Sequence, residues 1–158
     1  MLKLTVDIAQ QHLFVVAEQK IIKSYLISTA KKGMGEIKDS EQTPRGRHII
    51  RAKIGHDAPP NTVFIKRRAT GEIFTSRMRE IYPNRDWILT RIFWLSGLEA
   101  GINRLGKCDT MRRYIYIHGS PDDVLMGVSG SKGCIRMRNQ DIIELFEYIP
   151  VGTMITIG

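Results

Sequence analysis

The sequence predicts a mostly β fold with one or more helices, on three observations. Apolar and polar residues alternate at period two near the N-terminus, over residues 113–118 and at the C-terminus, which is typical of half-buried strands. Over residues 142–149 the apolar residues instead recur at helical spacing. The 158 residues contain no repeat, low-complexity segment or interdomain linker, so we expect a single domain over residues 1–158.

The N-terminal segment predicts three short strands. Apolar residues alternate over residues 2–8, and two more apolar segments follow polar breaks, over residues 13–16 and 21–27. Because the breaks are short, the three strands are expected to form a meander.

A turn separates this meander from the next expected strand. A polar loop over residues 31–42 ends in the sequence Thr-Pro-Arg-Gly at residues 43–46. Proline fixes one backbone torsion of such a turn and glycine tolerates the next. We therefore expect a strand over residues 47–54, followed by a loop over residues 55–61 that contains two prolines.

The middle of the chain is harder to interpret. Residues 63–85 mix charge with small apolar patches and predict no definite element. Residues 86–97 are β-branched and aromatic, which favours a buried strand with a turn at its end, and a buried helix is the alternative. Both tryptophans, Trp87 and Trp94, are expected in the core, with stacking on a substrate as the alternative. Residues 98–110 are expected to form a loop.

The strand expected over residues 113–118 ends at a histidine. Its isoleucines face one side, and the other side presents Tyr114, Tyr116 and His118. Further on, Asn139 is expected to cap the helix over residues 142–149.

After that helix, Pro150 and Gly152 are expected to end it. Residues 153–157 alternate once more, so we expect the chain to close as a strand.

Cys134 and His118 are the candidate nucleophile and base. A loop rich in glycine and serine separates them and is short enough to bring the two side chains together. A thiol attacks a carbonyl only as the thiolate, and a free cysteine has a pKa of about 8.5. We therefore expect His118 and the nearby Lys132 to lower the pKa of Cys134.

Two glycines next to this pair suggest supporting backbone groups. The amides of Gly133 and Cys134 are expected to form an oxyanion hole. No acidic residue has an obvious triad spacing, so the carbonyl of Gly119 is the expected group that orients His118.

Two arginines follow the cysteine. The guanidinium groups of Arg136 and Arg138 have the shape to hold a substrate carboxylate, although Arg136 is equally suited to bonding the backbone of its own turn. Cys108 is interpreted as an incidental thiol, and His12, His48 and His56 as solvated histidines.

The charge balance favours acidic ligands. The formal net charge is +8, but the basic residues are scattered and lack an RNA-binding aromatic motif, so no nucleic-acid partner is expected. Two cysteines form neither a disulfide framework nor a paired metal spacing. No membrane-spanning segment is apparent, and the start lacks the unbroken apolar run of a secretory signal. We expect a cytoplasmic protein if Met1 is the true start, or a periplasmic one if a leader has been trimmed.

Two segments resemble a known signature. Residues 117–119 (Ile-His-Gly) and 131–139 (Ser-Lys-Gly-Cys-Ile-Arg-Met-Arg-Asn) are similar to the motif of the YkuD-type L,D-transpeptidase catalytic domain. The Thr-Pro-Arg-Gly turn, the opening strand and the Val-Gly-Thr sequence at residues 151–153 are also similar, so the resemblance covers nearly the whole chain. Lys132 departs from the pattern, because the family usually has histidine there. A lysine is not a neutral base near pH 7, so His118 must act as the base.

The resemblance implies a β-sandwich-like fold and an acyl-enzyme on the cysteine, without metal or organic cofactor. It implies two groups of site residues: the catalytic set Cys134, His118, Gly119 and Gly133, and the substrate-binding set Lys132, Arg136, Tyr116 and Ser131. The implied partner is a peptidoglycan tetrapeptide or muropeptide, and acylation by carbapenem-type β-lactams is also implied.

The expected cytoplasmic location favours water as the acceptor, and hence an L,D-carboxypeptidase of murein recycling. The alternatives are an L,D-transpeptidase that forms 3,3 crosslinks or exchanges D-amino acids in the cell wall, and a non-catalytic module that binds wall peptides.

Overall fold

The structure, a computed structural model, describes residues 1–158. Its secondary structure is mostly strand, with two α-helices and one 3-10 turn, η1 (Gly106–Cys108). The helices are α1 (Ser76–Ile81) and α2 (Asn139–Tyr148). The strands are β1 (Leu2–Asp7), β2 (His12–Ala17), β3 (Lys20–Ser28), β4 (Gly46–Ile54), β5 (Thr62–Ile65), β6 (Arg68–Ile73), β7 (Ile88–Gly97), β8 (Tyr116–Ser120), β9 (Ile135–Arg138) and β10 (Met154–Ile157).

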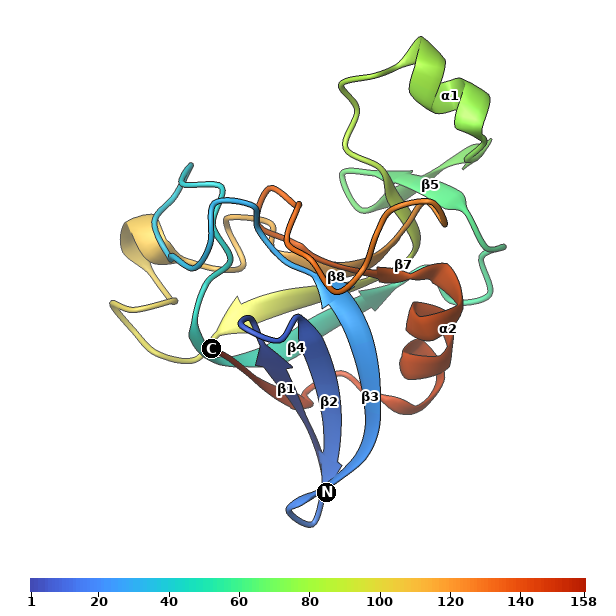
Figure 1. The fold of residues 1–158 in the computed structure, drawn as a ribbon. Helices are drawn as coiled ribbons and strands as arrows, with labels where there is room; N and C mark the ends of the chain where they lie inside the picture. Colours follow the sequence, from blue (N-terminus) through green and yellow to red (C-terminus); the bar gives the residue numbers. More distant parts are fainter.

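The strands form one sheet that closes on itself. The order is β4-β10-β1-β2-β3-β9-β8-β7, and β4 also pairs with β7, which joins the two ends into a barrel. The hairpin of β5 and β6 continues from β7 outside this closed ring, and β5 and α1 stand apart from the barrel in Figure 1. The mostly β fold is thus confirmed. The two sheets expected of a sandwich are parts of one closed sheet.

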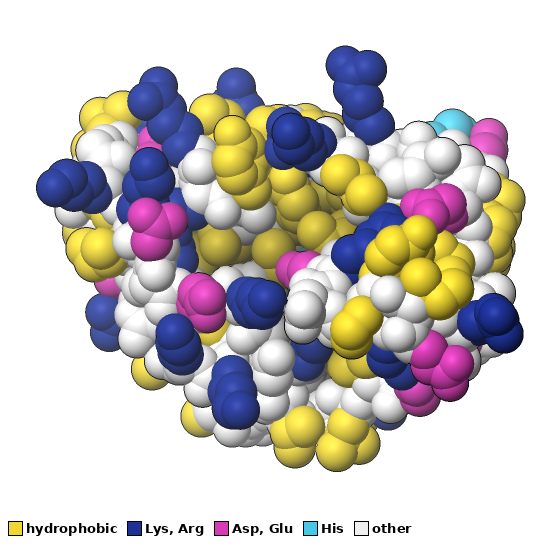
Figure 2. Space-filling view, turned by 90° about the horizontal axis from the view of Figure 1, so that it is seen from above, with side chains coloured by type: hydrophobic (Ala, Val, Ile, Leu, Met, Phe, Trp, Pro, Cys, Tyr) yellow, Lys and Arg dark blue, Asp and Glu magenta, His cyan; other side chains and the backbone are white.

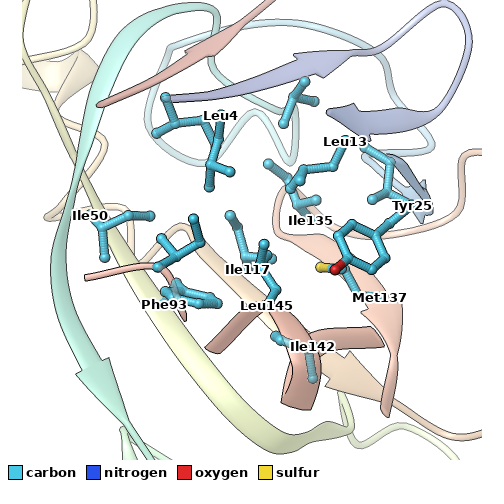
Figure 3. Packing of buried hydrophobic residues seen from close by; sticks show 14 of the residues in the cluster. Leu4, Leu13, Tyr25, Ile50, Phe93, Ile117, Ile135, Met137, Ile142 and Leu145 are labelled. Carbon is cyan, nitrogen blue, oxygen red and sulfur yellow. The ribbon is translucent and has the colours of Figure 1, made fainter. Parts of the chain in front are cut away.

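The core follows from the period-two alternation. Every second side chain of the barrel strands points to the same side, and together with α2 they form a cluster of 19 buried residues. Figure 3 shows the packing of this cluster, with Ile117 of β8 beside Leu145 of α2 and Ile135 of β9 toward Leu13 of β2. Each fully buried Leu or Ile side chain contributes about 1.5–3 kcal/mol to folding, so the closed barrel is the stable part of the molecule.

Several sequence predictions are confirmed. The meander is β1, β2 and β3, in antiparallel register. The strands expected after the Thr-Pro-Arg-Gly turn and at the C-terminus are β4 and β10. The apolar face of α2 is buried as its spacing predicts. Neither helix is long or apolar enough to cross a membrane.

The middle of the chain differs from expectation. Residues 63–85 carry β5, β6 and α1, for which the sequence predicted no element. The segment after them is a strand, so the helix alternative is wrong, but the predicted turn at Ser96–Gly97 is still part of β7. Gly97 lies there because a Cβ would come within 2.1 Å of the carbonyl oxygen of Asn103. Trp87 is buried as expected, whereas Trp94 is only half-buried.

His118 lies within its strand and does not end it. Strand β8 begins at Tyr116 and continues to Ser120, while Tyr114 precedes it with a positive φ of 56°. The strand continues past the histidine because Gly119 has no side chain. A Cβ there would lie 2.6 Å from the carbonyl oxygen of Leu89 on the neighbouring strand.

Two polar residues also differ from the sequence interpretation. Asn139 is the first residue of α2 and not its N-cap, and its buried side chain instead bonds Thr90, Asn61 and Asp122. His48 is fully buried, with Nε2 2.8 Å from the hydroxyl of Thr110, so its interpretation as a solvated residue is wrong.

Candidate active site

A short turn before β9 positions Cys134. Gly133 has a φ of +129°, in the region that favours glycine, and this lets the chain turn sharply into the strand. The hydroxyl of Ser131 donates to the carbonyl of Cys134 at 2.5 Å and accepts the amide of Gly133 at 3.2 Å. Ser131, predicted to bind substrate, therefore braces the turn that carries the candidate nucleophile.

The Thr-Pro-Arg-Gly turn holds the other side of this segment. The hydroxyl of Thr43 donates to the carbonyl of Gly133 at 2.9 Å and accepts the amide of Ala30 at 3.0 Å. Thr43 is fully buried, so water does not compete for these bonds. The sequence motif at residues 43–46 thus acts on the nucleophile's turn from a distant part of the chain.

The parallel pairing of β8 and β9 brings the histidine to the cysteine's side of the sheet. Ile117 and Ile135 are in register and face the core. Side chains alternate along a strand, so His118 and Cys134 both face away from that core. The amide of Tyr116, on the histidine's strand, donates to Sγ of Cys134 at 3.3 Å.

The carbonyl of Gly119 orients the imidazole. Nδ1 of His118 lies 2.6 Å from this oxygen, and because a carbonyl only accepts, Nδ1 must carry the proton. Nε2 of the neutral ring is then an acceptor, and it makes no hydrogen bond with the protein. No hydrogen bond joins His118 to Cys134 in this structure. The expected backbone contact of His118 is present, and the catalytic roles remain predictions.

Cys134 opens into a cavity of about 580 Å³. Its apolar lining includes Ile88, Ile115 and Tyr116, and its charged lining is Lys66, Arg67, Asp86, Arg113 and Lys132. Figure 2 looks onto this end of the molecule and shows a hollow with an apolar floor and Lys and Arg side chains at its rim. The site therefore suits an acidic ligand with some apolar length.

The pKa shifts of Cys134 and His118 leave both side chains uncharged in the resting protein. Burial raises the pKa of Cys134 to about 12, against the lowering effects of the Tyr116 amide and of Arg113. Burial also lowers the pKa of His118, although the charge of Asp86 raises it. The prediction that His118 and Lys132 lower the cysteine pKa is wrong, because the cation that lowers it is Arg113. At pH 7 the thiol of Cys134, which lines the cavity, and the buried imidazole of His118 are therefore both neutral.

One of the two expected oxyanion-hole donors is occupied. The amide of Gly133 donates to Ser131, as described above, whereas the amide of Cys134 donates to no protein atom. The Cys134 amide is thus the backbone donor free to stabilise an oxyanion.

The predicted substrate-binding residues are separated. Lys132 and Tyr116 line the cavity of the cysteine. Arg136 lies on a second cavity of about 270 Å³, and its Nη2 donates to the hydroxyl of Ser28 at 2.8 Å, so it does not bond the backbone of its own turn. Arg138 is exposed on the end of β9.

Sequence reasoning missed several cavity residues. Arg113 lines the cavity, and its Nη2 donates to the carbonyl of Gln42 at 2.7 Å. In the sequence, only its place before the tyrosines pointed to a role in the site. Asp86 lines both cavities. Lys66 and Arg67 come from the segment whose pattern was too weak to interpret, so no signal placed them near Cys134.

Comparisons with known proteins agree with this arrangement. A family model described as the L,D-transpeptidase catalytic domain matches residues 3–157. A Bacillus subtilis protein named "Putative L,D-transpeptidase YkuD" is 46% identical over 47 residues, which are 30% of this chain and 29% of that protein.

Two solved structures share the fold. The L,D-transpeptidase from Mycobacterium smegmatis has a TM-score of 0.57 and 16% identity, over 99% of this chain and 58% of that chain. L,D-transpeptidase 3 from Mycobacterium tuberculosis, in complex with a faropenem-derived adduct, has a TM-score of 0.56 and 11% identity, over 99% of this chain and 59% of that chain. The present chain thus covers less than two thirds of each of these relatives.

Proposed function

Because this chain belongs to the family of L,D-transpeptidase catalytic domains, we propose that it cleaves the L,D bond of peptidoglycan tetrapeptides. In this proposal Cys134 attacks the carbonyl between meso-diaminopimelate and the terminal D-alanine. Water then resolves the acyl-enzyme, so the protein is an L,D-carboxypeptidase that releases D-alanine and a tripeptide. This chain covers only part of the length of its relatives, and the choice of water as the acyl acceptor is part of the proposal.

The first half-reaction transfers one proton through His118. As Sγ of Cys134 attacks, a sulfur–carbon bond forms and Nε2 of the imidazole accepts the thiol proton. The free amide of Cys134 donates to the oxyanion. The carbon–nitrogen bond then breaks, and the imidazolium gives the proton to the nitrogen of the leaving D-alanine. The result is a thioester on Cys134.

The second half-reaction returns the thiol. Water adds to the thioester, and His118 accepts its proton and passes it to the departing sulfur. The observation that carries the proposal is the orientation of this base: Nδ1 is fixed on Gly119, which leaves Nε2 free on the side of the sheet that carries the thiol.

The cavity lining supports water as the acceptor. Five charged side chains border the thiol's cavity, and charged groups keep their hydration water. Their excess of positive charge also suits peptides that carry several carboxylates. Because water-dependent trimming serves free turnover peptides, we extend the proposal to murein recycling in the cytoplasm, which fractionation of cells with an antibody against the protein would test.

Transpeptidation is the second candidate, and the second cavity favours it. Asp86 lines this cavity and that of the thiol, so the second cavity is a neighbouring place for an amine acceptor. An amine in place of water would give a 3,3 crosslink or an exchanged D-amino acid.

The test is incubation with the tetrapeptide L-Ala-D-Glu-meso-diaminopimelate-D-Ala, followed by mass analysis of products. The carboxypeptidase proposal expects tripeptide and D-alanine, lost in Cys134→Ala and kept in the matched thiol control Cys108→Ala. Dimer or exchange products with little hydrolysis would establish transpeptidation. Faropenem and imipenem should acylate the wild type at Cys134. A non-catalytic binding module would show neither acylation nor cleavage.

A further inference from the structure

The hairpin turn between β5 and β6 carries two basic residues in an unusual conformation. Lys66 and Arg67 both have positive φ, at 49° and 64°. Two-residue hairpin turns with positive φ at both positions favour Asn and Gly, so Lys and Arg are poor choices for folding alone. Strain of this kind is concentrated at functional sites. Both residues line the cavity of Cys134.

Arg67 is held firmly but has no anionic partner. Its guanidinium lies over the rings of Trp94 and Tyr114, at 4.8 Å and 4.7 Å, and Nη1 donates to the hydroxyl of Tyr116 at 2.9 Å. It makes no ion pair, and its other N–H groups bond no protein atom. The side chain is therefore fixed in place while most of its hydrogen-bonding capacity remains available to a ligand.

Asp86 is the free anion of the same cavity. Its carboxylate makes no hydrogen bond and no ion pair, although its charge acts on His118, Cys134 and Arg136 at longer range. Asp86 and Arg67 line one cavity without pairing with each other. The cavity thus offers a ligand one carboxylate among four cations, and neither Asp86 nor Arg67 forms an ion pair within the protein.

We propose that Arg67 and Asp86 together bind a zwitterionic amino-acid group of the substrate, with Arg67 on its carboxylate and Asp86 on its ammonium. Lys66 adds positive charge on the carboxylate side. Both residues are specificity-determining groups outside the signature that carries the chemistry. This proposal rests on the proposed function, because it assumes that the ligand of the cavity is the acyl donor.

Tyr116 indicates which part of the donor is bound. Its amide contacts Sγ of Cys134 and its hydroxyl contacts Arg67, so about the length of a tyrosine separates the reacting sulfur from the guanidinium. The carboxylate of the leaving D-alanine is only a few bonds from the scissile carbonyl and is too close. The distal centre of diaminopimelate lies at the end of a side chain and carries both a carboxylate and an ammonium. Arg67 and Asp86 should therefore select for this centre in its free form.

The experiment compares four tetrapeptides that differ only at the third residue. They contain free meso-diaminopimelate, its distal carboxamide, its distal N-acetyl derivative, and lysine, which lacks the carboxylate. For the wild type we expect kcat/KM to fall about tenfold to a hundredfold for each altered peptide, the range that a lost charge-assisted hydrogen bond produces.

The variants separate the two halves of the proposed site. Arg67→Met should reduce the preference for the free carboxylate over the carboxamide to within about twofold, while the preference against the N-acetyl peptide persists. Asp86→Asn should do the reverse. Arg68→Met is the matched control, because Arg68 is the exposed neighbour with the same charge and does not line the cavity. Unchanged preferences in both Arg67→Met and the more conservative Arg67→Lys would overturn the proposal.

Binding to Cys134→Ala, measured by calorimetry with the same peptides, keeps this proposal distinct from the proposed function. Cleavage of all four peptides at equal rates would refute the zwitterion site and leave the function standing. If the wild type cleaves no peptide but the free peptide still binds in an Arg67-dependent manner, the zwitterion site stands and the proposed function is refuted. Equal binding of all four peptides, with no cleavage, would refute both.

Discussion

The barrel and the extension formed by β5, β6 and α1 differ in how they are stabilised. The barrel encloses a cluster of 19 buried residues and has no free sheet edge between β4 and β7. The extension packs around a small cluster of Val63, Trp87 and Leu89, and α1 buries no residue of its own. Its isoleucines Ile73 and Ile81 are about half exposed.

The residues proposed for chemistry and those proposed for recognition lie in different regions, the barrel and the extension. The thiol, the imidazole and the bracing hydroxyls all belong to the barrel or to turns tied to it, where atoms are held in place by the core. The extension contributes Lys66 and Arg67, which are long cations on a strained turn. The barrel therefore fixes the reacting atoms, whereas the extension is free to vary the ligand that they act upon.

Removal of the thiol should give the largest effect. Cys134→Ala is expected to lower tetrapeptide turnover by at least about a thousandfold, because no other cysteine and no serine or threonine lines the cavity. Thermal unfolding should be nearly unchanged, since alanine fits the same space. Turnover that survives in Cys134→Ala but not in Cys108→Ala would move the chemistry out of this part of the barrel.

The base and its pKa give the next effect. His118→Gln should lower kcat by about a hundredfold to ten-thousandfold. The pKa of Cys134 is raised to about 12 by burial, so alkylation of the wild-type thiol by iodoacetamide should still be rising well above pH 8.5. An alkylation rate that levels off near pH 7 would show a preformed thiolate and contradict the neutral resting pair.

Truncation of the core should separate the two regions by stability. Leu13 is fully buried in the barrel, and Leu13→Ala should cost about 2–5 kcal/mol of unfolding free energy. The same kind of truncation in the extension, Ile73→Ala, should cost under about 0.5 kcal/mol because the side chain is already exposed. Equal losses in denaturant titrations would remove the distinction between barrel and extension.

Acid should destabilise the barrel through its buried histidine. Burial lowers the pKa of His48 from 6.5, so as the pH falls the unfolded chain is protonated at His48 before the folded chain is. The stabilisation is complete above pH 6.5 and is lost as the pH falls below it, by about 1.4 kcal/mol per pH unit for each such group. His48→Gln should flatten this slope, whereas exposed His56→Gln, in the loop that leads to the extension, should leave it unchanged.

The smallest effect is expected at the ion pair between α1 of the extension and the segment that follows β8. Arg79 of α1 pairs with both carboxylate oxygens of Asp123, a partly exposed pair that is worth at most about 1 kcal/mol. Arg79→Ala should speed amide hydrogen exchange in α1 and β6 without changing exchange in β8. Faster exchange throughout the barrel would show that the two regions open as one unit.

The same difference explains how much of the structure could be predicted from the sequence. The barrel strands bury one face, so their apolar alternation predicted the meander, β4 and β10 correctly. In the extension, β6 has no buried residue and β5 is buried at three of four positions, so neither strand alternates. Its weak pattern reflects packing on a sheet edge.

The sequence also predicted only part of the candidate active site. Local spacing predicted the backbone contact of His118 with the carbonyl of Gly119. Burial could not be predicted, and burial reverses the expected pKa shift of the cysteine. Asn139 and His48 were misinterpreted because their hydrogen-bond partners, Thr90 and Thr110, come from distant segments.

The most direct test of the account is the intact mass of the protein shortly after mixing with the tetrapeptide. The account predicts a transient adduct equal in mass to the tetrapeptide less D-alanine, located on Cys134 by peptide mapping and absent from Cys134→Ala. An unmodified protein that nevertheless releases D-alanine, or an adduct on Cys108, would contradict acyl transfer by the thiol at the barrel.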